Sequence, residues 1–87
     1  MTVVMVYDVQ EKRCGSALKI ARRYLTRVQN SVFEGELTSG KLAALKRELK
    51  DSLDLSYDSV MFYTWRENNY ASRETMGTAF AAPERFI

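Results

Sequence analysis

Two kinds of hydrophobic pattern alternate along the chain, and their order restricts the possible folds more than any other feature. Residues 2–6 form an almost unbroken run of β-branched and apolar residues, which is typical of a buried strand. An amphipathic helical pattern follows, and then a mixed apolar and polar stretch at residues 28–37 (VQNSVFEGEL). A second helix is predicted by leucines that recur at helical spacing, namely Leu42, Leu45, Leu49 and Leu53. Residues 58–65 (DSVMFYTW) give a further apolar strand, and a weaker strand candidate lies at residues 72–78.

This order predicts an α+β fold in which two helices cover one face of a mostly antiparallel sheet. A ferredoxin-like βαββαβ sandwich is the natural choice, and it needs two strands between the helices. The alternation in residues 28–37 slips near Asn30-Ser31. Either this strand bends and counts twice, or the sheet is irregular there. We expect residues 1–65 to form the ferredoxin-like core and residues 66–87 to add a C-terminal strand and a docking tail to the same domain.

The 87 residues can bury one modest core, so the chain should gain stability in an oligomer. The C-terminal part also carries apolar residues with no evident place in so small a core, and we expect these to contact a neighbouring subunit: Met76, Phe80, Phe86 and Ile87. The single cysteine excludes an internal disulfide, and there is no leader pattern or apolar run of membrane-spanning length. We therefore expect a cytoplasmic homodimer without a membrane partner.

The side-chain inventory excludes several kinds of active site. With no histidine and one cysteine, the chain has no imidazole base, no Cys-His nucleophile and no ordinary zinc site. Hydrolytic chemistry would have to use arginines and carboxylate-bound Mg²⁺ or Mn²⁺. The candidate carboxylate is Asp8, which follows Tyr7 where the first strand should leave the core. The alternative is that Asp8 only caps the following loop.

The positive charge is concentrated in one segment. Between Lys12 and Phe33 there are six basic residues and no acidic one, whereas the rest of the chain has seven basic and eleven acidic residues. On a helical wheel, one side of this segment is basic, through Lys12, Lys19, Arg22, Arg23 and Arg27. The face is either simply solvated or binds a polyanion, and the absence of compensating acidic residues supports the second interpretation. Arg13 and Arg27 are the strongest candidates for phosphate contact.

Three features together resemble a known family. They are Val6-Tyr7-Asp8-Val9 at the end of the first strand, the basic first helix, and residues 27–35 (RVQNSVFEG). The chain resembles the second CRISPR-associated protein family, whose members are short ferredoxin-like proteins that act in spacer acquisition. The similarity runs from Thr2 to about Trp65, and the combination of the two motifs is more specific than either alone.

The resemblance implies a homodimer in which the two Asp8 carboxylates face each other across the two-fold axis and hold Mg²⁺ or Mn²⁺. It also implies metal-dependent endonuclease activity on RNA or DNA in some members. Relatives often have a further acidic residue soon after the first Asp, whereas this chain has Gln10 and Glu11, which leaves open whether Glu11 completes a metal shell. The C-terminal strand should add to an existing sheet edge, either its own or that of the other subunit, and the resemblance favours the edge of the other subunit.

Two functions follow as alternatives. The first is a metal-dependent endonuclease with Asp8 as catalytic residue and metal ligand. The second is a non-catalytic adaptor that bridges CRISPR integrase subunits and holds duplex DNA. Both require nucleic-acid binding, and the predicted contacts are Tyr7, Arg13, Lys19, Arg22, Arg23, Arg27 and Phe33. For the two aromatic residues, packing in the core is the alternative to stacking on a base.

Overall fold

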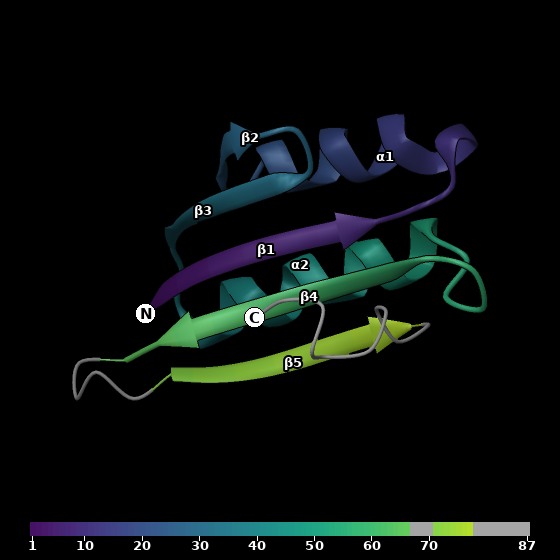
Figure 1. The fold of residues 1–87 in the computed structure, drawn as a ribbon. Helices are drawn as coiled ribbons and strands as arrows, with labels where there is room; N and C mark the ends of the chain where they lie inside the picture. The colour runs from purple at the N-terminus through teal and green to yellow at the C-terminus, as the bar shows by residue number, and fades with distance from the viewer. Residues whose placement is uncertain (67–70, 78–87) are drawn as a thin grey trace, which may run out of the picture.

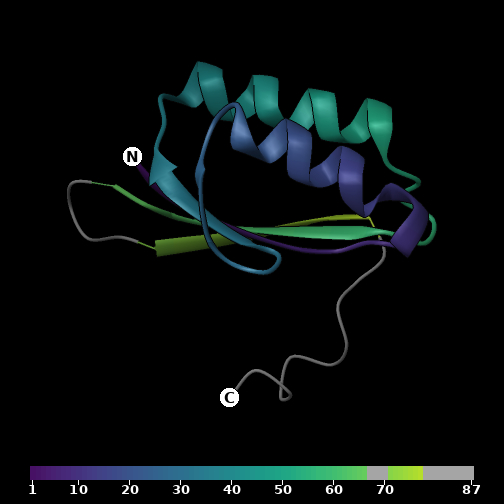
Figure 2. The ribbon, with the colours of Figure 1, turned by 90° about the horizontal axis from the view of Figure 1, so that it is seen from above.

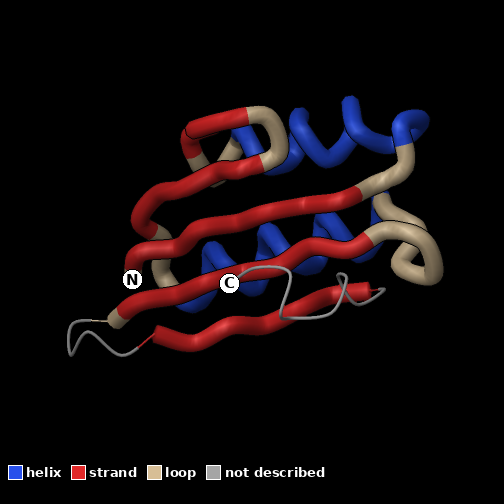
Figure 3. The backbone as a smooth tube through the Cα atoms, in the orientation of Figure 1, coloured by secondary structure: helices blue, strands red, loops and turns tan. Residues whose placement is uncertain are grey.

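A five-stranded antiparallel sheet with both helices on one face forms the body of the protein (Figures 1 and 2). The computed structural model describes residues 1–66 and 71–77. The elements are β1 (Thr2–Asp8), α1 (Glu11–Arg22), β2 (Thr26–Gln29), β3 (Val32–Glu36), α2 (Ser39–Ser52), β4 (Ser59–Trp65) and β5 (Ala71–Gly77). The strand order is β2-β3-β1-β4-β5, with β1 in the centre (Figure 3). The predicted α+β, ferredoxin-like arrangement is confirmed, with β5 as an additional edge strand.

The central strand β1 shows why the sequence forms a sheet covered on one side. Val3, Met5 and Tyr7 are buried, whereas the residues between them are more exposed, as expected for the two-residue period of a strand. β1 pairs with β3 on one side and with β4 on the other. Asp8, the last residue of β1, pairs with Ser59, the first residue of β4. The helices therefore cover one face of β1, and Asp8 lies at the end of its other face.

The second helix follows the predicted leucine pattern closely. The Thr38 side chain caps its N-terminus by accepting a hydrogen bond from the Lys41 backbone N–H at 3.1 Å. The leucine stripe is buried, and Leu45 and Leu49 are fully inaccessible. Residues of α1 join the same core, namely Ala17, Ile20 and Ala21. The helical layer is thus attached to the sheet by ordinary apolar packing.

The stretch after α1 forms two strands, so the first of the two alternatives for it is confirmed. β2 and β3 form a hairpin, and Asn30 occupies the turn with a φ of 32°, a conformation that Asn tolerates better than most residues. The pairing register shifts between Arg27 and Gln29, which places a bulge at Val28. The placement of Arg27 on the helical wheel is wrong, because α1 ends at Arg22 and Arg27 pairs with Phe33 in the hairpin.

The late strand is confirmed as β5, one residue earlier than the prediction of residues 72–78. All seven of its residues pair antiparallel with β4 of the same chain. Exchange of this strand between two subunits is not seen in the single chain and stays a prediction. The proposed docking tail, with Phe80, Pro83, Phe86 and Ile87, lies outside the described residues. Among the described residues, neither helix has the length and apolar character needed to cross a membrane.

Candidate functional site

Asp8 presents an exposed carboxylate at the end of the sheet. Its backbone is fixed by pairing with Ser59, and its side chain lies on the face that the helices do not cover. Within the described part of the chain, this side chain makes no hydrogen bond or ion pair. The carboxylate is therefore available to solvent, to a cation or to a second chain.

One chain alone does not provide a closed metal site. Among residues 1–66 and 71–77 there is no group of three acidic, cysteine or histidine side chains that could hold a metal ion. Glu11 begins α1 three residues after Asp8 and is exposed. Mg²⁺ commonly retains several waters and takes one or two protein carboxylates together with substrate phosphate oxygens. A single exposed carboxylate such as Asp8 is compatible with an open site of this kind.

Next to Asp8 lies a buried acid that the sequence pattern did not identify as a site residue. Asp58 is fully buried, and it accepts hydrogen bonds from Arg13 Nε at 2.5 Å and from a terminal nitrogen of Arg13 at 3.1 Å. It also accepts from the backbone N–H groups of Gln10 and Asp54, both at 2.9 Å. These donors, with the Arg13 guanidinium first, lower the pKa of the Asp58 carboxyl to about 2 although burial acts in the opposite direction.

The sequence contained a partial signal for this pair. An acidic residue stands directly before an apolar strand, at a position that becomes buried, and a buried carboxylate requires a partner. Arg13 is that partner, and its side chain is only 16% exposed. The segment around Arg13 has no acidic residue, but the fold supplies one, because Asp58 comes from a loop 45 residues later in the chain.

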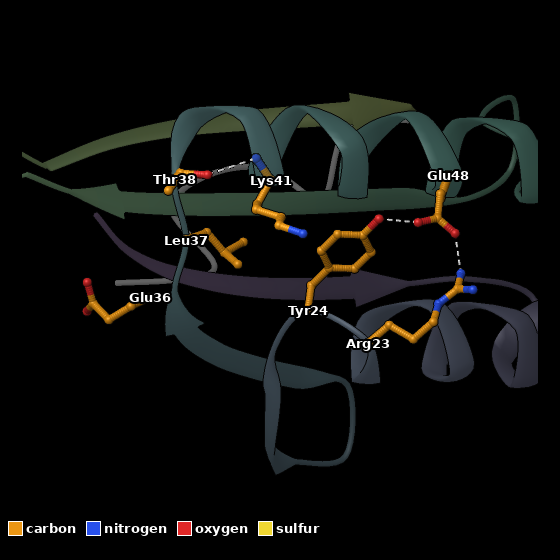
Figure 4. A pocket seen from close by; sticks show the side chains of 7 residues that line it. All are labelled: Arg23, Tyr24, Glu36, Leu37, Thr38, Lys41 and Glu48. Carbon is orange, nitrogen blue, oxygen red and sulfur yellow. Dashed lines mark hydrogen bonds and ion pairs between the residues drawn. The ribbon is translucent and has the colours of Figure 1, made fainter.

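Arg23 also has an acidic partner that its own segment does not supply. It forms an ion pair with Glu48 of α2, which also accepts a hydrogen bond from the Tyr24 hydroxyl (Figure 4). The hydrogen bond to Glu48 raises the pKa of Tyr24. These groups line a pocket of about 450 Å³ between the end of α1 and α2, and Lys41 also lies on its wall. Part of the Arg23 charge is therefore used to join the two helices.

The other basic residues remain exposed. Lys12, Lys19 and Arg22 lie on α1 and make no hydrogen bond or ion pair with the described residues. Arg27 is exposed on β2, where its Nε donates to the Asn30 carbonyl oxygen at 2.8 Å. This contact orients the side chain without neutralising it. The structure thus leaves these four cations uncompensated by any described residue, on α1 and on the adjacent hairpin.

Tyr7 and Phe33 lie in the core. Phe33 is fully buried, Tyr7 is 8% exposed, and their ring centroids are 6.1 Å apart at an interplanar angle of 26°. Burial raises the pKa of the Tyr7 hydroxyl. This arrangement supports the packing alternative, because neither ring has a free face in this chain on which a base could stack.

Comparisons with known proteins agree with this geometry. The family model described as CRISPR associated protein Cas2 matches residues 1–73. The CRISPR-associated endoribonuclease Cas2 of Thermotoga maritima is 52% identical over 77 residues, which are 88% of each chain. The protein of the same name from Dictyoglomus turgidum is 46% identical over 77 residues, with the same coverage. The crystal structure of Streptococcus pyogenes Cas2 at pH 6.5 aligns with a TM-score of 0.70 and 35% sequence identity over 78% of this chain and 89% of that chain. The chain therefore belongs to the Cas2 family of CRISPR-associated proteins.

Proposed function

We propose that this protein acts in CRISPR adaptation as a homodimeric, metal-dependent endonuclease that hydrolyses phosphodiester bonds in RNA or DNA. The observation that carries this proposal is Asp8, an exposed carboxylate without a partner in the described chain, at the end of a strand whose backbone is fixed by the sheet. Its position agrees with family membership, and the relatives from Thermotoga maritima and Dictyoglomus turgidum carry the name endoribonuclease.

The uncovered face of the sheet supports a homodimer. Both helices lie on the opposite face (Figure 2). The uncovered face carries partly exposed apolar and aromatic side chains, among them Val4, Val6, Val32 and the stacked pair Tyr63 and Trp65. A second copy packed on this face would bury those side chains. If the two-fold axis passes near the end of β1, as the family resemblance implies, the two Asp8 carboxylates would come close together and would repel unless they shared a proton or a cation.

In this mechanism the acidic and the basic residues of the chain have different roles. The two Asp8 carboxylates would hold the metal ion, which would supply Lewis acidity toward the scissile phosphate. The exposed cations Lys12, Lys19, Arg22 and Arg27 bind backbone phosphates on either side of the cleaved bond. No element of the described chain presents a set of side chains for reading base edges, so we expect cleavage with little dependence on sequence.

A second candidate function is a structural adaptor that holds duplex DNA and bridges CRISPR integrase subunits. The observation that favours it is the sparse carboxylate set, since the described residues hold no group of three side chains that could bind a metal ion. In that case the basic surface has the same role in binding, and Asp8 has none in catalysis.

The deciding experiment is a titration of Mg²⁺ and Mn²⁺ with single-stranded RNA and duplex DNA as substrates. Asp8→Asn keeps the shape of the side chain and removes its charge, so it should abolish cleavage while the fold and the dimer remain. Asp51→Asn, which neutralises an exposed carboxylate on α2, is the matched control and should keep full activity. Glu11→Gln tests whether Glu11 belongs to the metal shell.

The outcomes separate the two functions. Loss of cleavage in Asp8→Asn and in EDTA, with activity retained in Asp51→Asn, supports the nuclease. Equal activity of wild type and Asp8→Asn would exclude Asp8 as the catalytic residue. A wild type that binds duplex DNA and integrase without cleaving any substrate would favour the adaptor.

A further inference from the structure

We propose that Arg13 and Asp58 are positioning residues that hold Asp8 in place, and that Arg13 is not a phosphate contact. This inference rests on the proposed function, because it assigns the two residues to the Asp8 site. Arg13 lies in the first turn of α1 and Asp58 directly before β4, at the end of the sheet where β1 finishes (Figure 1). The pair therefore joins the two loops that flank Asp8.

The contacts of Gln10 connect the pair to Asp8. Gln10 stands two residues after Asp8, and its backbone N–H donates to the Asp58 carboxylate at 2.9 Å. Its side-chain oxygen accepts from Arg13 at 2.8 Å, and its backbone oxygen accepts from the Arg13 N–H at 2.8 Å. Gln10 is therefore held through three separate groups. The chain leaving Asp8 has a fixed path because of these bonds.

Asp58 also fixes Ser59, the residue that pairs with Asp8 across the sheet. Asp8 pairs across the sheet with Ser59, which follows Asp58 in the chain and is itself buried. Asp58 thus anchors the strand beside Asp8 through its backbone and the loop after Asp8 through its side chain. A carboxylate that must bind a metal ion together with a second carboxylate needs this kind of support, because small displacements of a catalytic group strongly lower the reaction rate.

The same contacts argue against Arg13 as a phosphate ligand. Its guanidinium uses Nε and a terminal nitrogen on Asp58, whose opposite charge lies at hydrogen-bond distance. The charge of Arg13 is thus already balanced: a phosphate that displaced Asp58 would leave a fully buried carboxylate without its cation, and a phosphate that only approached the other terminal nitrogen would meet the negative charge of Asp58 as well. Arg22 provides the contrast, since it is exposed and has no acidic partner in the described structure.

Salt dependence of binding tests this distinction without relying on catalysis. Affinities for single-stranded RNA and duplex DNA are measured over a range of salt for wild type, Arg13→Gln and Arg22→Gln. A lost phosphate contact flattens the slope of log K against log salt by about one. For Arg22→Gln we expect a change of about one for each subunit whose Arg22 contacts the nucleic acid, which is up to about two in the homodimer, and for Arg13→Gln we expect an unchanged slope. A slope reduced equally in both variants would overturn the inference, whereas no change in Arg22→Gln would count against the proposed basic surface instead.

Cleavage and metal binding test the positioning role. Arg13→Lys keeps the charge but lacks the fork that binds both oxygens of Asp58, and Asp58→Asn keeps the shape but not the charge. Both variants should lower kcat at least about 10-fold with KM changed less than about twofold, because substrate binding is spared. Both should also weaken Mn²⁺ binding, measured by electron paramagnetic resonance with Asp8→Asn as the blank. Circular dichroism and the mass of the dimer identify a variant that fails to fold. If one of the two variants fails to fold, the other variant tests the positioning role.

These readouts keep failure of the inference apart from failure of the proposed function. If the wild type cleaves and Arg13→Lys retains full kcat and Mn²⁺ affinity, Arg13 acts through its charge alone and the inference is wrong. If the wild type does not cleave, the nuclease proposal fails. The inference is then tested by the Mn²⁺ affinity of the Arg13 and Asp58 variants and by the salt slope of Arg13→Gln. If the wild type binds no Mn²⁺ through Asp8, there is no metal site to position and both proposals fall.

Discussion

Acid should remove a defined part of the stability of this protein through Asp58. The folded-state pKa of this carboxyl is about 2, against an ordinary value of 3.8, so folding favours its charged form. The stabilisation is fully present above the unfolded-state pKa and is lost as the pH falls through the folded-state pKa. A shift of almost two pKa units corresponds to roughly 2.5 kcal/mol in total, of which about 1 kcal/mol should be lost at pH 3 and about 2 kcal/mol at pH 2.

The assay compares wild type with Asp58→Asn by urea unfolding at several pH values from 7 to 2. Protein concentration is held constant, because dissociation of a dimer would contribute to the apparent stability. Other carboxylates titrate in both proteins and largely cancel in the difference between them. The excess free energy of unfolding of the wild type should therefore shrink by about 2 kcal/mol between neutral pH and pH 2.

Two further proteins, Arg13→Gln alone and Arg13→Gln combined with Asp58→Asn, test whether Arg13 causes the lowered pKa of Asp58. Arg13 makes the largest contribution to the lowered pKa of Asp58, so Asp58→Asn made in an Arg13→Gln background should have a much smaller pH-dependent effect. If wild type and Asp58→Asn instead lose stability in parallel from pH 7 to pH 2, Asp58 is not ionised in the folded state in the way its contacts require. If the effect persists without Arg13, the backbone donors are the main cause.

Three further predictions concern β5 and assembly. Gly77 has a φ of 83°, and a Cβ there would lie 2.2 Å from the Asp58 carbonyl oxygen, so Gly77→Ala should lower the free energy of unfolding by about 2 kcal/mol or more. Gly15→Ala, in a helix position with open space, should instead stabilise by up to about 1 kcal/mol, and equal effects in urea melts would refute the steric argument. Light scattering should give about twice the chain mass of 10.0 kDa, and a monomer at micromolar concentration would contradict the paired site. Truncation after Trp65 should weaken the dimer in gel filtration, and truncation after Thr78 should spare it but weaken integrase capture in a pull-down. Normal behaviour of either shortened protein would remove the corresponding role of the C-terminal part.

Local periodicity predicts most of the elements of this fold. The alternation in β1 and the leucine spacing in α2 each depend on neighbours within a few residues, and the structure follows both. The hairpin after α1 was harder, since β2 has four residues, all exposed, and therefore lacks a hydrophobic pattern. Its turn at Asn30-Ser31 was visible as a slip in the alternation, but the slip did not show where the helix ended.

The candidate site was predictable only in part, because its decisive contacts join distant segments. Asp8 could be identified from its position at the end of an apolar strand. The partners of Arg13 and Arg23 could not, since Asp58 and Glu48 lie 45 and 25 residues away along the chain. Searching for acidic residues three or four positions from a basic one finds only partners on the same helix, and it misses partners from distant segments of the chain.

These long-range pairs change the meaning of the basic segment. The sequence shows six cations between Lys12 and Arg27 and no acidic residue among them, which suggests a uniform polyanion-binding surface. In the folded chain, Arg13 balances a buried carboxylate and Arg23 joins α1 to α2 through Glu48. The cations of this segment left for phosphate are therefore at most about four per chain, and the salt dependence of binding should reflect that smaller number. The pairing of Arg13 with Asp58 also fixes the loop after Asp8. Arg13 is therefore not available for nucleic-acid binding because it supports the geometry of the proposed metal site.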